Sequence, residues 1–105
     1  MIVTFEDKYL RELYEKGKAA DKKHRFQPEI VRKYKYCINA LESASGIEAI
    51  CNVKSFNYEE LQGDKKGISS IRVNLKYRIE FTVKDSGNET IVTVCNILEL
   101  SNHYK

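Results

Sequence analysis

Two arginines in an alternating stretch are the residues of this sequence best suited to chemistry. Arg72 and Arg78 lie between Ser69 and Phe81, where apolar and polar side chains alternate. A period of two indicates strands with one buried face, and it places both arginines on the opposite face. A guanidinium group carries a permanent charge and a planar set of donors that suits a phosphate. The pattern predicts a phosphate-binding surface, with a merely solvated sheet face as the alternative.

Proton transfer needs a further group, and the sequence holds two histidines, His24 and His103. Histidine titrates near neutral pH without perturbation, so we predict that His103 transfers a proton during cleavage of an RNA phosphodiester. Tyr104 would stack on a nucleotide base or assist the proton transfer. RNA supplies its own nucleophile, the 2′-OH, and the arginines would stabilise the pentacoordinate phosphate. The alternative is that His103 and Tyr104 belong to a frayed chain end and that His24 lies on the surface. Candidate RNA contacts are the lysines Lys65, Lys66, Lys76 and Lys105.

Other kinds of catalytic site find little support. No HExxH pattern, clustered acidic motif, Walker loop or GxSxG elbow occurs in the sequence. Three cysteines, Cys37, Cys51 and Cys95, lack CxxC spacing, so we expect free and mostly buried thiols. We therefore expect neither a metal nor a cofactor. The lack of a signal peptide or a membrane-spanning stretch leads us to expect a cytoplasmic protein without a membrane partner.

Composition and charge point to a single domain over residues 1–105 with one concentrated basic segment. The formal net charge of the whole chain is +3. Between Gly17 and Tyr36, however, seven basic residues stand against two acidic ones, a net charge of +5. Such a segment can meet phosphates or an acidic partner, or it can be a solvated helix face.

The elements that position these residues follow from periodicity and boundary signals. A short opening strand at Ile2 to Phe5 precedes a helix from Asp7 to Lys16, and a second helix begins at Pro28. A weak strand near Phe56 to Leu61 leads into two strands joined by a tight turn. The two strands and the last one, which we expect to be central in its sheet, are Ser69 to Val73, Tyr77 to Val83 and Thr90 to Leu100. The order β-α-α-β-β-β predicts an α+β fold with two helices packed on an antiparallel sheet.

The stretch from Gly63 to Phe81 resembles the central motif of HigB-type toxins, a branch of the RelE/ParE toxin-antitoxin superfamily. The pattern is GDKxGxxSIRVNxxYRIxF, and the ending CNILELSNHYK also resembles that of some members. The resemblance implies a RelE-like fold with two N-terminal helices on a small antiparallel sheet. It also implies a toxin that enters the ribosome and cuts mRNA without a metal. Its partner would be a HigA-type helix-turn-helix antitoxin, and the toxin would contact DNA only indirectly, through this antitoxin.

Carried over by motif, Arg72 and Arg78 match the SIR and YR arginines of the family. The tail departs from the family pattern. Many members end the last strand in Asp-Tyr-His, where this chain has Glu99-Leu100-Ser101 or Asn102-His103-Tyr104, so the general acid or base stays open. Asn57 also stands where some relatives have His or Arg. Two alternative functions are a noncatalytic, ParE-like inhibitor of DNA gyrase and an RNA-binding module without cleavage.

Overall fold

Two helices form where apolar stripes meet clear boundary residues. In the computed structural model, which describes residues 1–85 and 93–102, α1 spans Lys8–Lys16 and α2 spans Pro28–Ser43. Gly17 ends α1 because it adopts a left-handed φ of 81°, and its N–H donates to the Leu13 carbonyl at 3.2 Å. Pro28 opens α2, where a missing N–H leaves no helical hydrogen bond unmade. Both boundaries agree with the sequence prediction.

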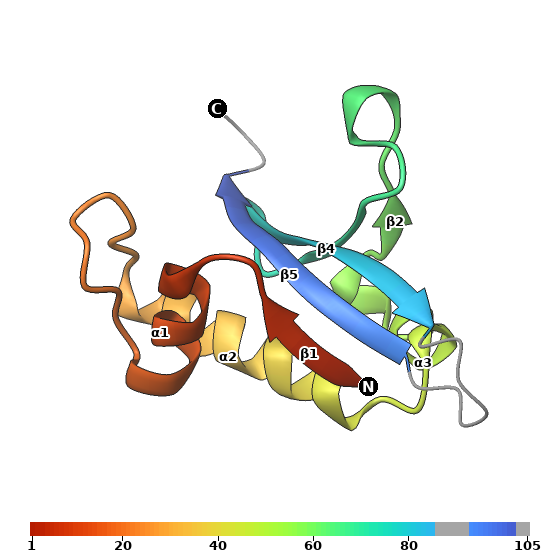
Figure 1. Ribbon diagram of the computed structural model, residues 1–105, viewed down its shortest axis with the longest axis horizontal. Helices are drawn as coiled ribbons and strands as arrows, with labels where there is room; N and C mark the ends of the chain where they lie inside the picture. Colours follow the sequence, from red (N-terminus) through yellow and green to blue (C-terminus); the bar gives the residue numbers. More distant parts are fainter. Residues whose placement is uncertain (86–92, 103–105) are drawn as a thin grey trace.

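Five strands form one sheet in the order β1-β5-β4-β3-β2 (Figure 1). They are β1 (Ile2–Phe5), β2 (Glu59–Glu60), β3 (Ser69–Arg72), β4 (Tyr77–Asp85) and β5 (Thr93–Asn102). The predicted α+β fold is confirmed, and so is the position of the last strand between two neighbours. One pair refines the prediction, because β1 runs parallel to β5 whereas all other pairs are antiparallel. No hairpin joins β1 to β5, so no tight turn imposes the antiparallel direction on them.

The core lies between the helices and one face of the sheet, and Figure 1 shows α1 and α2 on the same side of it. Fully buried side chains come from both layers: Leu10, Leu13, Tyr34, Ile38 and Leu41 from the helices, and Ile71, Ile79, Phe81 and Ile97 from the strands. The Tyr34 hydroxyl donates to the Leu10 carbonyl at 2.7 Å, which ties α2 to α1 inside the core. Because alternate strand residues fill this core, the intervening ones, Arg72 and Arg78 among them, leave the opposite face.

Short elements connect α2 to the sheet. They are α3 (Ile47–Cys51), the 3₁₀ helices η1 (Lys54–Phe56) and η2 (Gly63–Lys65), and the two-residue β2. The weak strand predicted near Phe56 to Leu61 is thus shorter than expected, because Phe56 enters the core from a helical turn. Asn57 follows with a left-handed φ of 45° at the end of η1, and the chain then enters β2 at the edge of the sheet.

The three cysteines carry no disulfide, as predicted, and two of them are buried. Burial raises the pKa of the Cys37 thiol to about 12, so it stays protonated at neutral pH. Cys51 is exposed. Within residues 1–85 and 93–102, no helix has the length and apolar character needed to cross a membrane.

Candidate active site

A tight hairpin brings the two arginines together on the open face of the sheet. Arg72 of β3 and Arg78 of β4 are direct register partners. The turn between them is held by the Asn74 side chain, whose Oδ1 accepts from the N–H groups of Lys76 and Tyr77 at 2.9 and 2.7 Å. The hairpin and the placement of both arginines away from the core confirm the prediction from alternation.

A pocket opens beside the arginine pair. It is lined by Asn57, Glu59, Ser70, Arg72, Asn74, Tyr77 and Arg78, and we call it the arginine pocket. Pairing of Glu59 with Ser70 places this carboxylate on the same strip of the sheet as the two arginines. Within the part of the chain that the structure describes, the Arg72 guanidinium has neither an ion-pair nor a hydrogen-bond partner. The pocket therefore joins two permanent cations to a carboxylate that can exchange a proton.

A buried carboxylate holds Arg78 in place. Only 3% of the Glu80 side chain is exposed, and its Oε2 accepts from Arg78 Nε and contacts Arg78 Nη2, each at 3.0 Å. Lys65 of η2 donates to both oxygens of Glu80, at 3.0 and 2.9 Å. One carboxylate thus joins two cations from distant parts of the motif. Sequence reasoning missed Glu80, because the alternation marks it only as another polar residue of the open face.

The exposure of Arg78 corrects one expectation. Its side chain is 18% exposed, so Arg78 is not the freely solvated arginine that a wet sheet face predicts. The ion pair between Arg78 and Glu80 is less exposed to water than a surface ion pair, so solvent and salt weaken it less. Substitution of Arg78 by Ala would therefore affect folding as well as any chemistry, because the buried Glu80 would lose one of its two cationic partners.

Three of the predicted lysine contacts, Lys65, Lys66 and Lys76, do not line the arginine pocket. Lys65 is held by Glu80, and Lys76 is exposed in the turn. Lys66 is exposed beside a different hollow, which Tyr58 and Val83 also line. His103, Tyr104 and Lys105 lie outside the described residues. The end of β5 is nevertheless close to the site, because Ser101 is the register partner of Arg78 and Asn102 that of Tyr77.

Asn57 and Glu59 are pocket residues that sequence reasoning did not assign to the site. The sequence marks Asn57 only as a position where some relatives have His or Arg, and it places Glu59 within a weak strand. An acidic residue in a strand beside the motif can share the open face of the motif, which makes Glu59 a possible member of the site. The strand is too short for periodicity to reveal that face, however.

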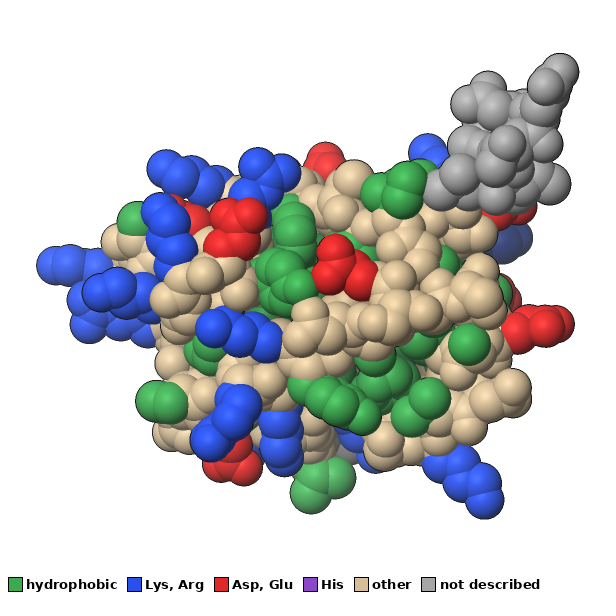
Figure 2. Space-filling view, turned by 90° about the horizontal axis from the view of Figure 1, so that it is seen from below, with side chains coloured by type: hydrophobic (Ala, Val, Ile, Leu, Met, Phe, Trp, Pro, Cys, Tyr) green, Lys and Arg blue, Asp and Glu red, His purple; other side chains and the backbone are tan. Residues whose placement is uncertain are grey.

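The basic segment between Gly17 and Tyr36 forms the loop after α1 and the first half of α2. Figure 2 shows that Lys and Arg side chains gather at the end of the molecule where Figure 1 places this loop. The loop meets the sheet through Phe26, whose ring lies edge-on to Tyr77 with centroids 5.6 Å apart. The segment therefore lies at the same end of the sheet as the arginine pocket but contributes no residue to its lining.

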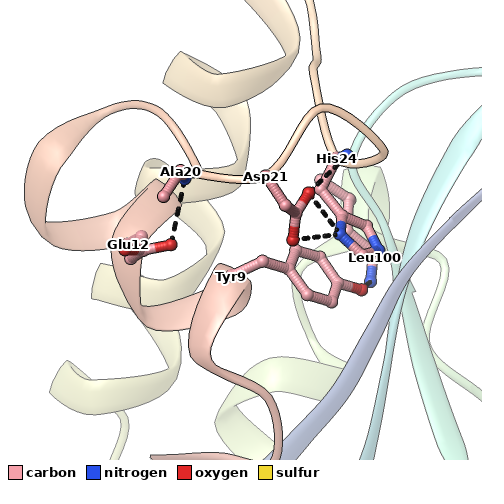
Figure 3. A network of polar contacts seen from close by, with 6 residues as sticks. All are labelled: Tyr9, Glu12, Ala20, Asp21, His24 and Leu100. Carbon is pink, nitrogen blue, oxygen red and sulfur yellow. Dashed lines mark hydrogen bonds and ion pairs between the residues drawn. The ribbon is translucent and has the colours of Figure 1, made fainter.

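His24 has a structural role that the sequence did not predict. Its ring stacks on Tyr9 with a centroid separation of 3.5 Å and an interplanar angle of 6°. As Figure 3 shows, His24 Nδ1 and the His24 backbone N–H both meet the Asp21 carboxylate, each at 2.9 Å. The hydrogen bond from His24 holds the pKa of the Asp21 carboxyl below its ordinary value of 3.8. His24 is thus an anchor of the loop, where a surface position without contacts was expected.

Residues able to hold a metal do not cluster in the described ranges, where no group of three or more His, Cys, Asp or Glu side chains is found. The residues that line the arginine pocket include two guanidinium groups, which can stabilise negative charge, and the Glu59 carboxylate, which can accept a proton.

Comparison with known proteins gives consistent matches. A family described as the RelE-like toxin of the type II toxin-antitoxin system HigB matches residues 3–95. Toxin HigB-1 of Vibrio cholerae serotype O1 is 34% identical over 82 residues, which cover 77% of this chain and 82% of that protein.

Two solved structures share the fold. A YoeB/ParE toxin from Agrobacterium tumefaciens superposes with a TM-score of 0.61 at 19% identity, covering 99% of this chain and 100% of its own. A chain of a YoeB-YefM complex from Staphylococcus aureus gives a TM-score of 0.58 at 18% identity, covering 99% and 98%. At such identities the two structures inform on the fold alone.

Proposed function

The chain belongs to the HigB family of RelE-like toxins of type II toxin-antitoxin systems, and from this premise we propose that it is a metal-free endoribonuclease that cuts mRNA on the ribosome. The observation that carries the proposal is the arginine pocket, in which Arg72, Arg78 and Glu59 line one hollow on the open face of the sheet. Such a group of side chains has the charge and the donors that a scissile phosphate needs.

The proposed mechanism divides the work among the pocket residues. Arg72 and Arg78 bind the phosphate oxygens and stabilise the charge that develops as the 2′-OH attacks. Glu59 accepts the proton of that hydroxyl, because its carboxylate lines the same pocket. We assign protonation of the leaving 5′ oxygen to His103, with Tyr104 stacking on a base or assisting the proton transfer, and this assignment rests on the sequence.

The proposed partners follow from the family. A toxin of a type II system is paired with an antitoxin, and we infer a HigA-type protein that neutralises this chain and makes the DNA contacts of the complex. The similar Staphylococcus aureus structure is a complex of YoeB with YefM, which supports pairing of this fold with a second protein. Action on translating ribosomes would take place in the cytoplasm.

Mapping of 5′ ends on a defined mRNA tests the cleavage directly. Purified protein is incubated with the mRNA in the presence and absence of translating ribosomes, together with an Arg72→Ala variant. Because Arg72 has no ion-pair partner among the described residues, this variant should keep its thermal stability and lose most of its cuts. Lys84→Ala, at an exposed position of β4 that does not line the pocket, is the matched control and should cut normally.

Three results would contradict the proposal. Cuts that persist in folded Arg72→Ala would remove the arginine pocket from the chemistry. Growth arrest without any cuts would favour a noncatalytic target, and inhibition of supercoiling by purified gyrase would then identify it as ParE-like. RNA binding without cuts or growth arrest would indicate an RNA-binding module.

A further inference from the structure

A groove separate from the arginine pocket runs between the loop that follows α1 and the first turns of α2. Two adjoining hollows, of about 440 and 530 Å³, share Gly17, Lys18, Phe26 and Val31 as lining residues. We call their union the α1–α2 groove, and its apolar and basic lining residues include Leu13, Lys18, Arg25, Phe26, Val31, Arg32 and Lys35. None of these residues lines the arginine pocket.

The groove has an apolar floor and a basic rim. Leu13 and Val31 form the floor as buried core side chains, and Phe26 closes one side. The rim is basic: Lys18, Arg25, Arg32 and Lys35. A surface of this kind suits a ligand that combines an apolar anchor with negative charge.

The positive charge of the rim is not neutralised within the described chain. The segment 17–36 holds two acidic residues, and both already have partners, Asp21 with His24 and Glu29 with Lys33 at 3.7 Å. Glu12 of α1 turns inward and accepts the N–H of Ala20 at 3.1 Å. Within residues 1–85 and 93–102, none of the four rim cations forms an ion pair.

The wall of the groove is held in a defined shape. Figure 3 shows the loop fixed at three points, by Glu12 at Ala20, by Asp21 at His24 and by the stack of His24 on Tyr9. Tyr9 in turn accepts the backbone N–H of Leu100 through its hydroxyl at 3.4 Å, which joins the loop to β5. A wall that is already ordered lowers the entropy cost of binding.

We propose that the α1–α2 groove binds an acidic segment of the antitoxin that inserts apolar side chains between the rim cations. This proposal rests on the proposed function, because it names the surface through which that partner docks. Nucleic acid fits the groove less well. Its floor is aliphatic, and the two rings among its lining residues, Phe26 and His24, already contact Tyr77 and Tyr9, whereas bases stack on open aromatic planes.

The test is the affinity of the purified full-length toxin for its purified cognate antitoxin, measured by calorimetry at low and at high salt. In Arg32→Glu/Lys35→Glu, two rim cations become acidic, and the dissociation constant should rise by about tenfold or more at low salt. The control is Lys54→Glu/Lys84→Glu, which makes the same change of charge at exposed positions outside the groove. It should bind within about twofold of the wild type, and circular dichroism would verify that both variants fold.

Each other outcome overturns the proposal in a recognisable way. Equal affinities of the two double variants would place the antitoxin elsewhere. Loss of ribosome-dependent cleavage in Arg32→Glu/Lys35→Glu, with antitoxin binding unchanged, would show that the groove serves RNA. Failure of the wild-type toxin to bind the antitoxin would overturn the partner itself, and the cleavage assay would then stand as the separate test of the enzymatic function.

Discussion

The arginine pocket and the α1–α2 groove are both basic, but their charges are compensated in opposite ways. Beside the pocket, a buried carboxylate of the same sheet face joins Lys65 and Arg78. In the groove, the nearby acidic residues bind backbone N–H groups, a histidine or a lysine outside the rim, and the rim cations have no partner within the described residues. The first region holds Lys65 and Arg78 in fixed positions beside the pocket, with Arg72 unpaired among the described residues. The second leaves all four of its rim cations available to another molecule.

This difference teaches that the location of acids decides what a basic surface can do. Cations that folding has already oriented can stabilise the charge of a transition state, because they do not have to reorganise during the reaction. Cations without partners instead attract an acidic molecule over a distance and are screened by salt. Four comparisons test the contrast.

The largest effect is expected for Arg78→Lys. Lysine keeps a positive charge near the buried Glu80, so thermal stability should change little, whereas the planar fork that a phosphate needs is lost. We expect single-turnover cleavage on ribosomes to fall by about 10²-fold or more. The same substitution of Arg32 in the groove should leave cleavage unchanged. Equal effects of the two substitutions would remove the distinction between the regions.

Removal of the buried carboxylate should have the next largest effect. Glu80→Ala leaves Lys65 and Arg78 close together without an acid, and we expect a loss of about 1–3 kcal/mol in the free energy of unfolding, measured with urea. Glu59→Ala, on the same sheet face but exposed, should stay within about 0.5 kcal/mol of the wild type. Affinity of Glu80→Ala for RNA should rise at low salt, since one negative charge has left the site.

A smaller effect is expected when single lysines of the two regions are compared. Lys65 is 44% exposed and bonds the buried Glu80, so Lys65→Met should cost about 1 kcal/mol of stability. Lys35→Met removes a rim cation that has no acidic partner in the described chain, and it should be neutral or slightly stabilising. Thermal melts of both variants in one buffer make the comparison. A larger loss for Lys35→Met would contradict the assignment of unpaired charge to the groove.

The smallest effect concerns acid pH and the wall of the groove. The hydrogen bond from His24 lowers the pKa of the Asp21 carboxyl below its ordinary value of 3.8. This contact therefore stabilises the folded loop fully at pH values above 3.8, and the stabilisation is lost as the pH falls through the lower pKa of the folded protein. The protection factor of the His24 amide, which is its intrinsic exchange rate at each pH divided by the measured rate, should therefore fall in that acidic range. Asp21→Asn should remove this transition, and the amides around Arg72 should show none.

Local patterns predicted the parts of the site that depend on neighbouring residues. Alternation and the turn between the strands were sufficient to place Arg72 and Arg78 on the same open face, and Gly17 and Pro28 marked the helix boundaries. The cluster around Glu80 could not be predicted from the sequence pattern, because Lys65 lies fifteen residues before Glu80 in the chain. Periodicity indicates from which face of the sheet a side chain projects, but it does not indicate which distant segment covers that face.

The same reason explains the roles of His24 and β1. The stack of His24 on Tyr9 joins residues that no local motif relates, and the parallel direction of β1 depends on a strand about 90 positions later. Both depend on tertiary packing, which sequence periodicity does not reveal.

The pairing of β1 with β5 also has a consequence for how the chain folds during its own synthesis. The two helices and the β3–β4 hairpin consist of local contacts and can form early, whereas β1 has to wait for residues 94–97 before it gains its strand partner. Until then the nascent chain exposes apolar surface that chaperones recognise. A protein proposed to attack translation would thus complete its sheet only after its own β5 has left the ribosome.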